Sequence, residues 1–209
     1  MTTRTLAVVS AGLSQPSSTR MLADKLADQT VAKLKAEGID TTVETFELRD
    51  VATDVMNHML TGFPSPKLEA VIEAVTGADG LIAVTPIFTT SYSGLFKSFF
   101  DVIDSAALAG MPVAIGATAG TPRHSLALDY ALRPMFTYLH ATVVPTGVFA
   151  ATSDWGDAAD SVKTLPARID RAAGELAALV AASDRSTTVR DPFALDRPFG
   201  HLIGGLAGE

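Results

Sequence analysis

Short runs of apolar, often β-branched residues recur along the 209-residue chain and alternate with segments of helical periodicity. These runs are too short for helices and show no polar alternation, which is typical of strands buried on both faces of a parallel sheet. They occupy residues 6–10, 41–46, 80–85, 113–117 and 143–149. Strands that alternate with helices predict an α/β fold, with a five-stranded parallel sheet and helices on both of its faces.

The helical segments separate these strands. Apolar residues recur at helical spacing in residues 18–37, 66–75, 93–103, 125–139 and 157–182. Pro166 lies inside the last segment and is expected to break it in two. This arrangement favours the flavodoxin-like strand order, in which a ligand binds at the carboxyl ends of the strands near the switch point.

The chain is expected to form one domain over residues 1–183, followed by an extended arm over residues 184–209. Proline and glycine punctuate this arm, yet it carries Phe193, Phe199 and Leu202. A purely disordered tail would have fewer large apolar groups. We therefore expect the arm to pack on this subunit or on a neighbour.

The amino-acid composition and the net charge exclude several classes of function. Hydrophobic residues make up 47% of the chain and its mean hydropathy is +0.28, but no apolar run reaches the length of a membrane span. The net charge of −7 argues against nucleic acid as a partner. The absence of cysteine excludes disulfides and thiolate chemistry. The first residues lack a secretory apolar region, so a cytoplasmic location is expected.

A cluster of hydroxyl side chains follows the first predicted strand, which ends at Ser10. Ser14, Ser17, Ser18 and Thr19 lie within six positions, at the start of a predicted helix. Short hydroxyls and the free N–H groups of a helix N-terminus suit a phosphate. The loop has neither the lysine of a P-loop nor the glycine pattern of a dinucleotide fold. It indicates a site for a small phosphate monoester such as the FMN tail, or else a cluster of N-cap residues.

A second loop follows the third predicted strand. Its Pro86, Ile87 and Phe88 are suited to covering a flat aromatic ring, and Tyr92 and Ser93 precede the next helix. The carboxyl ends of parallel strands meet at one edge of the sheet, so this loop is expected beside the first.

A third loop follows the fourth predicted strand and contains Thr118, Ala119, Gly120 and Thr121. Glycine there would allow the backbone to approach a planar ligand closely. Each loop alone could be an ordinary connection between a strand and a helix. Together, the three loops describe a flavin site better than an acid–base site.

Other catalytic motifs are weak. The four histidines show no metal-ligand spacing, so we expect no metal; His124 is the one that lies in a candidate ligand loop. No G-x-S-x-G elbow supports a hydrolase, and Asp101 and Asp104 fit a solvated helix face. Hydride transfer between nicotinamide and flavin requires mainly binding and orientation, so a lack of acid–base residues is compatible with a flavoenzyme.

Three segments, 78–97, 117–124 and 128–134, closely resemble the NAD(P)H-dependent FMN reductases. The similarity is strongest to the reductase components of two-component flavin monooxygenases, such as those for alkanesulfonates, and covers about residues 5–150. It implies a flavodoxin-like fold, reduction of FMN by NADPH or NADH, and delivery of reduced flavin to a partner monooxygenase. It also implies that residues 10–19 hold the phosphate, that residues 86–88 cover the isoalloxazine ring, and that residues 118–121 lie near that ring.

The chain departs from this family at one position. Many members carry an arginine where this chain has Ser14, so the phosphate lacks a charge-assisted partner. Arg20 is a candidate substitute, but it would have to curl back from the first helical turn. FMN is therefore expected to bind loosely, as a substrate rather than as a prosthetic group.

Pro134 follows Tyr130 by four residues, so the Tyr130 carbonyl loses its regular helical partner. A π-bulge can absorb such a break. In the resembling reductases a tyrosine here lies at the oligomer interface near the flavin, whereas in an ordinary helix it would be packing. The resemblance also favours a homodimer or homotetramer. Seven apolar residues in predicted helices could form the contact surface between subunits, unless they face their own sheet: Leu95, Phe96, Phe99, Phe100, Leu132, Met135 and Phe136.

Alternative functions on the same fold stay open. One is a quinone or azo-dye reductase with tightly held FMN. Another is a flavodoxin-like electron carrier without a nicotinamide site, and a third is a module that has lost its flavin. The sequence does not distinguish NADH from NADPH.

Overall fold

A computed structural model describes residues 3–156, 164–183 and 185 of the chain. The predicted C-terminal arm, except for Arg185, lies outside these described residues. No helix within the described ranges is long and apolar enough to cross a membrane.

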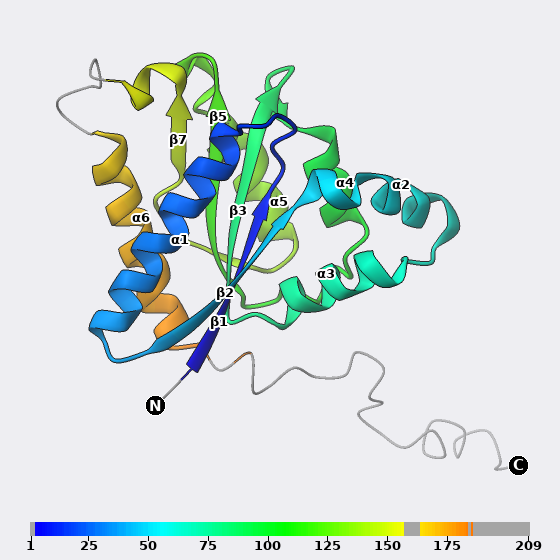
Figure 1. Cartoon of the computed structure of the whole chain (residues 1–209), viewed down its shortest axis with the longest axis horizontal. Coiled ribbons are helices and arrows are strands. Elements are labelled where there is room, and N and C mark those ends of the chain that lie inside the picture. Colours follow the sequence, from blue (N-terminus) through cyan, green and yellow to red (C-terminus); the bar gives the residue numbers. More distant parts are fainter. Residues whose placement is uncertain (1–2, 157–163, 184, 186–209) are drawn as a thin grey trace, which may run out of the picture.

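A seven-stranded sheet forms the centre of the fold (Figure 1). Its strands are β1 (Thr3–Ser10), β2 (Asp40–Glu47), β3 (Gly80–Phe88), β4 (Ser91–Tyr92), β5 (Pro112–Ala119), β6 (Thr142–Val143) and β7 (Val148–Ala151). The order is β2-β1-β3-β5, and both β6 and β7 pair with β5. All of these pairings are parallel except that of β4 with β3, so the flavodoxin-like order is confirmed.

The count of five strands needs correction at two places. The predicted fifth strand, residues 143–149, is divided into β6 and β7. Pro145 lies between them and has no N–H to donate to a strand ladder. The additional strand β4 forms an antiparallel hairpin with the end of β3.

Helices cover both faces of the sheet, as predicted (Figure 1). The α-helices are α1 (Ser18–Ala36), α2 (Ala52–Thr61), α3 (Pro66–Gly77), α4 (Gly94–Asp101), α5 (Arg133–Tyr138) and α6 (Leu165–Ala181). Four short helices are also present: η1 (Leu48–Val51), η2 (Pro122–His124), the π-helix η3 (Leu128–Leu132) and η4 (Thr152–Trp155). In β1, Leu6 and Val8 pack into the α1/α6 layer, whereas Ala7 and Val9 pack into the layer that contains α3, α4 and α5.

Three local features differ from the predicted arrangement. Strand β2 is not buried on both faces: it lies at the sheet edge, pairs only with β1, and exposes Val43. Pro166 lies in the first turn of α6, where its missing N–H has no helical partner to lose, and residues 157–163 of the predicted helical segment lie outside the described residues. Helix α2 was missed, because Met56 and Leu60 on it are exposed and give no core-facing pattern.

The helical segment near Pro134 contains the expected π-helical turn. Helix η3 spans Leu128–Leu132 and ends two residues before Pro134, which lies in the first turn of α5, and Tyr130 is 79% exposed. The apolar residues expected at an oligomer surface behave differently. Five of them, Phe96, Phe99, Phe100, Leu132 and Phe136, are buried in the core of their own subunit and offer no free surface, and Leu95 and Met135 are half-buried against that core.

Candidate functional site

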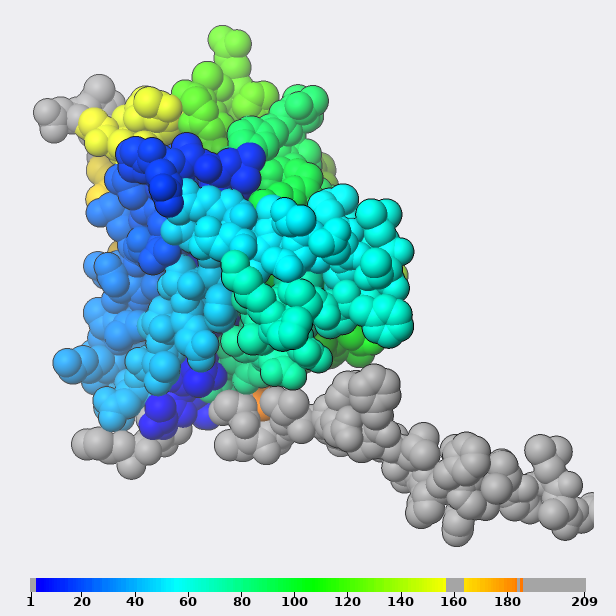
Figure 2. Space-filling view, turned by 45° about the vertical axis from the view of Figure 1, so that its right-hand side comes forward, coloured from blue at the N-terminus to red at the C-terminus, as the bar shows by residue number. Residues whose placement is uncertain are grey.

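Three segments from the carboxyl ends of β1, β3 and β5 lie at the same end of the molecule (Figure 2). They are the loop from Ser10 to Thr19, the β3–β4 hairpin, and residues 118–124 that lead into η2. Parallel pairing of β1 with β3, and of β3 with β5, brings them there. The three predicted loops therefore meet at one edge of the sheet.

The first loop is shaped as an anion cradle at the N-terminus of α1. Ser17 is the N-cap: its Oγ accepts a 3.2 Å hydrogen bond from the Arg20 N–H, which leaves the hydroxyl proton for another acceptor. Ser10, fully buried at the end of β1, has an Oγ without a hydrogen-bond partner among the described residues. The first turn of α1 carries no acidic residue.

Gly12 allows the side chains of Ser17 and Thr19 to lie close against the loop backbone. A Cβ atom at this position would lie 2.0 Å from the Ser17 Oγ and 3.1 Å from the Thr19 Cβ. Any larger residue would therefore displace the N-cap side chain. The small backbone at Gly12, the buried hydroxyl of Ser10 and the free N–H groups of the helix start fit the phosphate of FMN.

A buried hydrogen bond joins the first and third segments. The hydroxyls of Thr19 and Thr118 lie 2.8 Å apart, and both residues are buried. Ser14 and Ser18 are exposed at the rim of the first segment. The hydrogen bond between Thr19 and Thr118 thus links the start of α1 to the end of β5 at the edge of the sheet where the three segments meet.

The second predicted loop is a hairpin, because β3 continues to Phe88 instead of ending at Thr85. Phe88 pairs with Ser91 in this hairpin, and its side chain is 47% exposed. Thr89 and Thr90 form the turn with φ values of 48° and 72°. Pro86, Ile87 and Tyr92 are half-buried. The hairpin therefore presents the exposed side chain of Phe88 next to its turn, at the edge where a ring was expected to bind.

Ser93 has a structural role that its prediction as a ligand residue did not include. It is buried at the N-cap of α4, where its Oγ accepts from the Phe96 N–H at 3.2 Å. Its own N–H donates to the Thr85 Oγ1 at 3.0 Å. Ser93 thus ties the hairpin to α4.

The third segment opens outward after β5. Ala119 and His124 are half-buried, whereas Gly120 and Thr121 are exposed. A Cβ at Gly120 would meet no other protein atom within 4 Å, so the fold itself does not require glycine there. Within the described part of the chain, no three His, Cys, Asp or Glu side chains group as they would around a metal ion.

Arg49 is the residue at this site that sequence reasoning missed. It lies in η1, directly after β2, and its Nη1 donates a 3.0 Å hydrogen bond to the Ser14 carbonyl oxygen. Its position just beyond the carboxyl end of a strand was the available signal. Arg20, the expected substitute, is turned toward carboxylates: its hydrogen bond with Asp24 and its pairing with Glu47 raise its pKa.

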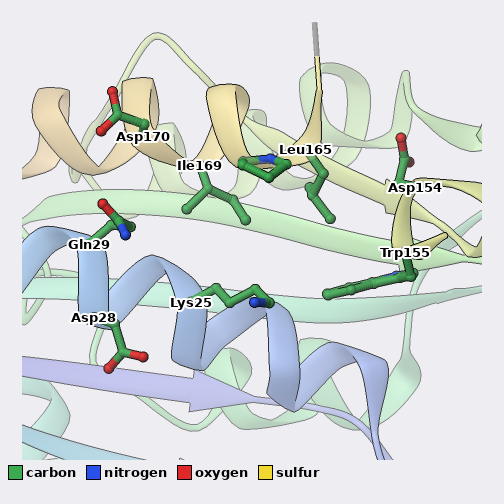
Figure 3. Close-up of a pocket in the computed structure, with 9 residues that line it drawn as sticks. Lys25, Asp28, Gln29, Asp154, Trp155, Leu165, Ile169 and Asp170 are labelled. Atoms are coloured by element: carbon green, nitrogen blue, oxygen red, sulfur yellow. The ribbon is translucent and has the colours of Figure 1, made fainter. Parts of the chain in front are cut away.

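A separate cavity of about 550 Å³ lies between α1 and α6 (Figure 3). Its walls include Lys25 of α1, Trp155 of η4 and Ile169 of α6. Two of its carboxylates are already paired, Asp154 with Arg168 at 2.6 Å and Asp170 with Lys33 at 2.7 Å. This cavity lies on the α1/α6 side of the sheet and includes none of the predicted site residues.

Sheet order and layers define a flavodoxin-like α/β protein, and the loop before α1 carries groups that are suited to a phosphate. Residues 4–156 match the family of NADPH-dependent FMN reductases. The chain is 36% identical over 171 residues to the FMN reductase (NADPH) of Pseudomonas aeruginosa, covering 82% of this chain and 89% of that relative. It shows the same identity and coverage with the NADH-dependent FMN reductase SfnF of Pseudomonas fluorescens. The chain therefore belongs to the NADPH-dependent FMN reductase family.

Solved structures agree with this assignment. An oxidoreductase from Corynebacterium diphtheriae superimposes with a TM-score of 0.84 at 50% identity, covering 88% of this chain and all of that one. The apo form of an NADH:FMN oxidoreductase, EMOB, gives a TM-score of 0.71 at 25% identity, covering 98% of this chain and 100% of that one.

Proposed function

We propose that this protein reduces FMN with NADPH or NADH, and that FMN binds through its phosphate to the loop from Ser10 to Thr19. The observation that carries this proposal is the buried hydroxyl of Ser10, which has no hydrogen-bond partner among the described residues and lies at the end of β1, where the loop begins. A single terminal phosphate suits this small cradle, so FMN is preferred over riboflavin and FAD.

The isoalloxazine ring is assigned to the space between the β3–β4 hairpin and the segment 118–121. In this assignment Phe88 and Tyr92 supply apolar and aromatic surface, and Thr118 to Thr121 supply backbone groups at the other side. Bound FMN would accept a hydride from the nicotinamide. The chain contributes binding, orientation and shielding from water.

Delivery of reduced flavin to a flavin-dependent monooxygenase belongs to the same proposal. A donor of diffusible flavin has to release its product, and an edge built from exposed loops supports release. A quinone or azo-dye reductase would instead retain FMN through its catalytic cycle, and an electron carrier would need no nicotinamide site.

A homodimer or homotetramer is also part of the proposal. Leu126, Tyr130 and Tyr138 expose large apolar or aromatic side chains on the segment from η2 through α5. Side chains of this size at the surface of one subunit are typical of protein contacts. We assign Tyr130 to an interface that keeps FMN exchangeable.

The test is oxidation of NADPH and of NADH by the purified full chain, measured with no flavin, with FMN, with riboflavin and with FAD. A diffusible-flavin reductase consumes nicotinamide only when flavin is added, and FMN gives the highest kcat/KM. Nicotinamide oxidation that needs a quinone but no added FMN would support the quinone reductase, and no oxidation with any acceptor would support the carrier. Light scattering that gives 21.8 kDa would rule out the oligomer.

A further inference from the structure

An ion-pair cluster borders the phosphate loop on its β2 side. Its centre is Glu47, the last residue of β2, which the parallel register places directly opposite Ser10 of β1. Ser10 is the buried residue from which the loop departs. Glu47 therefore lies one strand away from the base of the candidate phosphate site.

Glu47 contacts two arginines at once. Its Oε1 lies 3.2 Å from Arg20 Nη1, and its Oε2 lies 2.6 Å from Arg49 Nη2. The Glu47 and Arg49 side chains are only 16% and 18% exposed, so water screens this pair less than an open surface pair. Arg20 and Arg49 are thus paired with the same carboxylate.

These arginines are also the ones that touch the loop and its helix. Arg49 donates to the Ser14 carbonyl at 3.0 Å, and its guanidinium faces the Gln15 side-chain amide. Arg20 belongs to the first turn of α1, where its backbone N–H caps onto Ser17. A phosphate in the cradle would therefore compete with Glu47 for both guanidinium groups.

The charge of the cluster opposes tight phosphate binding. Arg20 also pairs with Asp24 at 2.7 Å, and Arg49 with Asp50 at 3.7 Å. Three carboxylates around two guanidinium groups leave one unit of net negative charge beside the loop. A phosphate monoester carries a charge approaching −2 near neutral pH. The loop's N–H and hydroxyl dipoles then hold the phosphate against an unfavourable local field.

We propose that Glu47 sets the affinity for FMN: by neutralising Arg20 and Arg49, it keeps the flavin phosphate weakly held and FMN exchangeable. This inference rests on the proposed function, because it takes FMN to be the ligand of the loop. Glu47 acts through the two arginines and does not contact FMN, so it is a positioning residue.

The variant that tests this role is Glu47→Gln, which removes the charge and keeps the side-chain size. Glu44→Gln is the matched control, since Glu44 lies on the same strand, is exposed, and undergoes the same change of charge. The measurements are Kd values for FMN and riboflavin from quenching of flavin fluorescence, the rate of FMN release, and Kd at several salt concentrations.

The expected result is that Glu47→Gln lowers the Kd for FMN by about tenfold and slows FMN release, because a freed guanidinium makes a charge-assisted bond to phosphate. The Kd for riboflavin stays at the wild-type value, and FMN binding becomes more sensitive to salt. Glu44→Gln changes none of these quantities. Arg49→Met in the Glu47→Gln background returns the FMN Kd toward the wild-type value.

An unchanged or higher Kd for FMN in Glu47→Gln overturns the inference, and so does an equal change for FMN and riboflavin. If wild-type protein reduces FMN and Glu47→Gln binds it as the wild type does, only the role of Glu47 is lost. A wild-type protein that neither binds nor reduces FMN contradicts the proposed function and this inference together.

Discussion

Replacing Ser17 with alanine should separate phosphate recognition from helix capping. The Ser17 Oγ accepts the Arg20 N–H at 3.2 Å, so its loss removes an N-cap worth about 1 kcal/mol. For a chain of this length, that corresponds to a fall in Tm of about 2–4 °C. The same hydroxyl keeps a proton that can be donated to the phosphate, and a hydrogen bond to a charged group is worth about 1–3 kcal/mol.

The affinities for FMN and for riboflavin should therefore respond differently to this substitution. The Kd of Ser17→Ala for FMN should rise by about 5- to 150-fold, while its Kd for riboflavin, which has no phosphate, should barely change. Both values can be measured by fluorescence titration of the flavin. Thr19→Ala should act in the same direction, because it also removes a hydroxyl of the loop.

Ser65→Ala is the matched control. Ser65 caps α3 as Ser17 caps α1, with its Oγ 3.2 Å from the Leu68 N–H, and it belongs to none of the three candidate segments. This variant should lose similar thermal stability and retain wild-type affinity for FMN. If Ser17→Ala weakens FMN and riboflavin equally, or if Ser65→Ala weakens FMN as much, the loop does not hold the phosphate.

Three further outcomes are expected. Gly12→Ala should raise the Kd for FMN at least tenfold in the same titration, because the new Cβ would lie 2.0 Å from the hydroxyl oxygen of Ser17. Gly77→Ala is the control and should leave this Kd unchanged, since a Cβ at Gly77 would have no other atom within 4 Å. Tyr130→Ala should change the mass measured by light scattering or the retention of flavin while far-UV circular dichroism stays near wild type; if mass, affinity and turnover all persist, Tyr130 is packing only. Burial raises the pKa of Glu175, but hydrogen bonds from Thr146 outweigh this and bring it below the usual value. Glu175→Gln should therefore reduce the free energy of unfolding near pH 7 by about 1 kcal/mol, which lowers Tm. The difference from the wild type should vanish as the pH falls through the lowered pKa of Glu175, and thermal melts at several pH values would show this.

The sequence predicted the fold well wherever one residue pattern decided the structure. Continuous apolar runs located β1, β3 and β5, since strands covered on both faces need apolar residues at every position. The same pattern located β2 but predicted its burial wrongly, because an edge strand is covered less completely than a central strand. Helix α2 was not predicted, because its apolar residues Met56 and Leu60 are exposed and do not form a stripe that faces the core.

The candidate site was predictable in its segments but not in its contacts. Loops after parallel strands must meet at one edge, so residues 10–19, 86–93 and 118–124 could be grouped from sequence. The bond between Thr19 and Thr118 joins residues 99 positions apart, and no local pattern encodes it. Arg49 was missed because an arginine reaching back to a neighbouring loop leaves no periodic signal.

A crystal structure of the full chain with FMN tests the central claim most directly. We expect the phosphate at the start of α1, within hydrogen-bond distance of Ser17 and close to Ser10, with the ring between the β3–β4 hairpin and residues 118–121. Flavin bound elsewhere would contradict it, for example in the cavity between α1 and α6 beside Trp155.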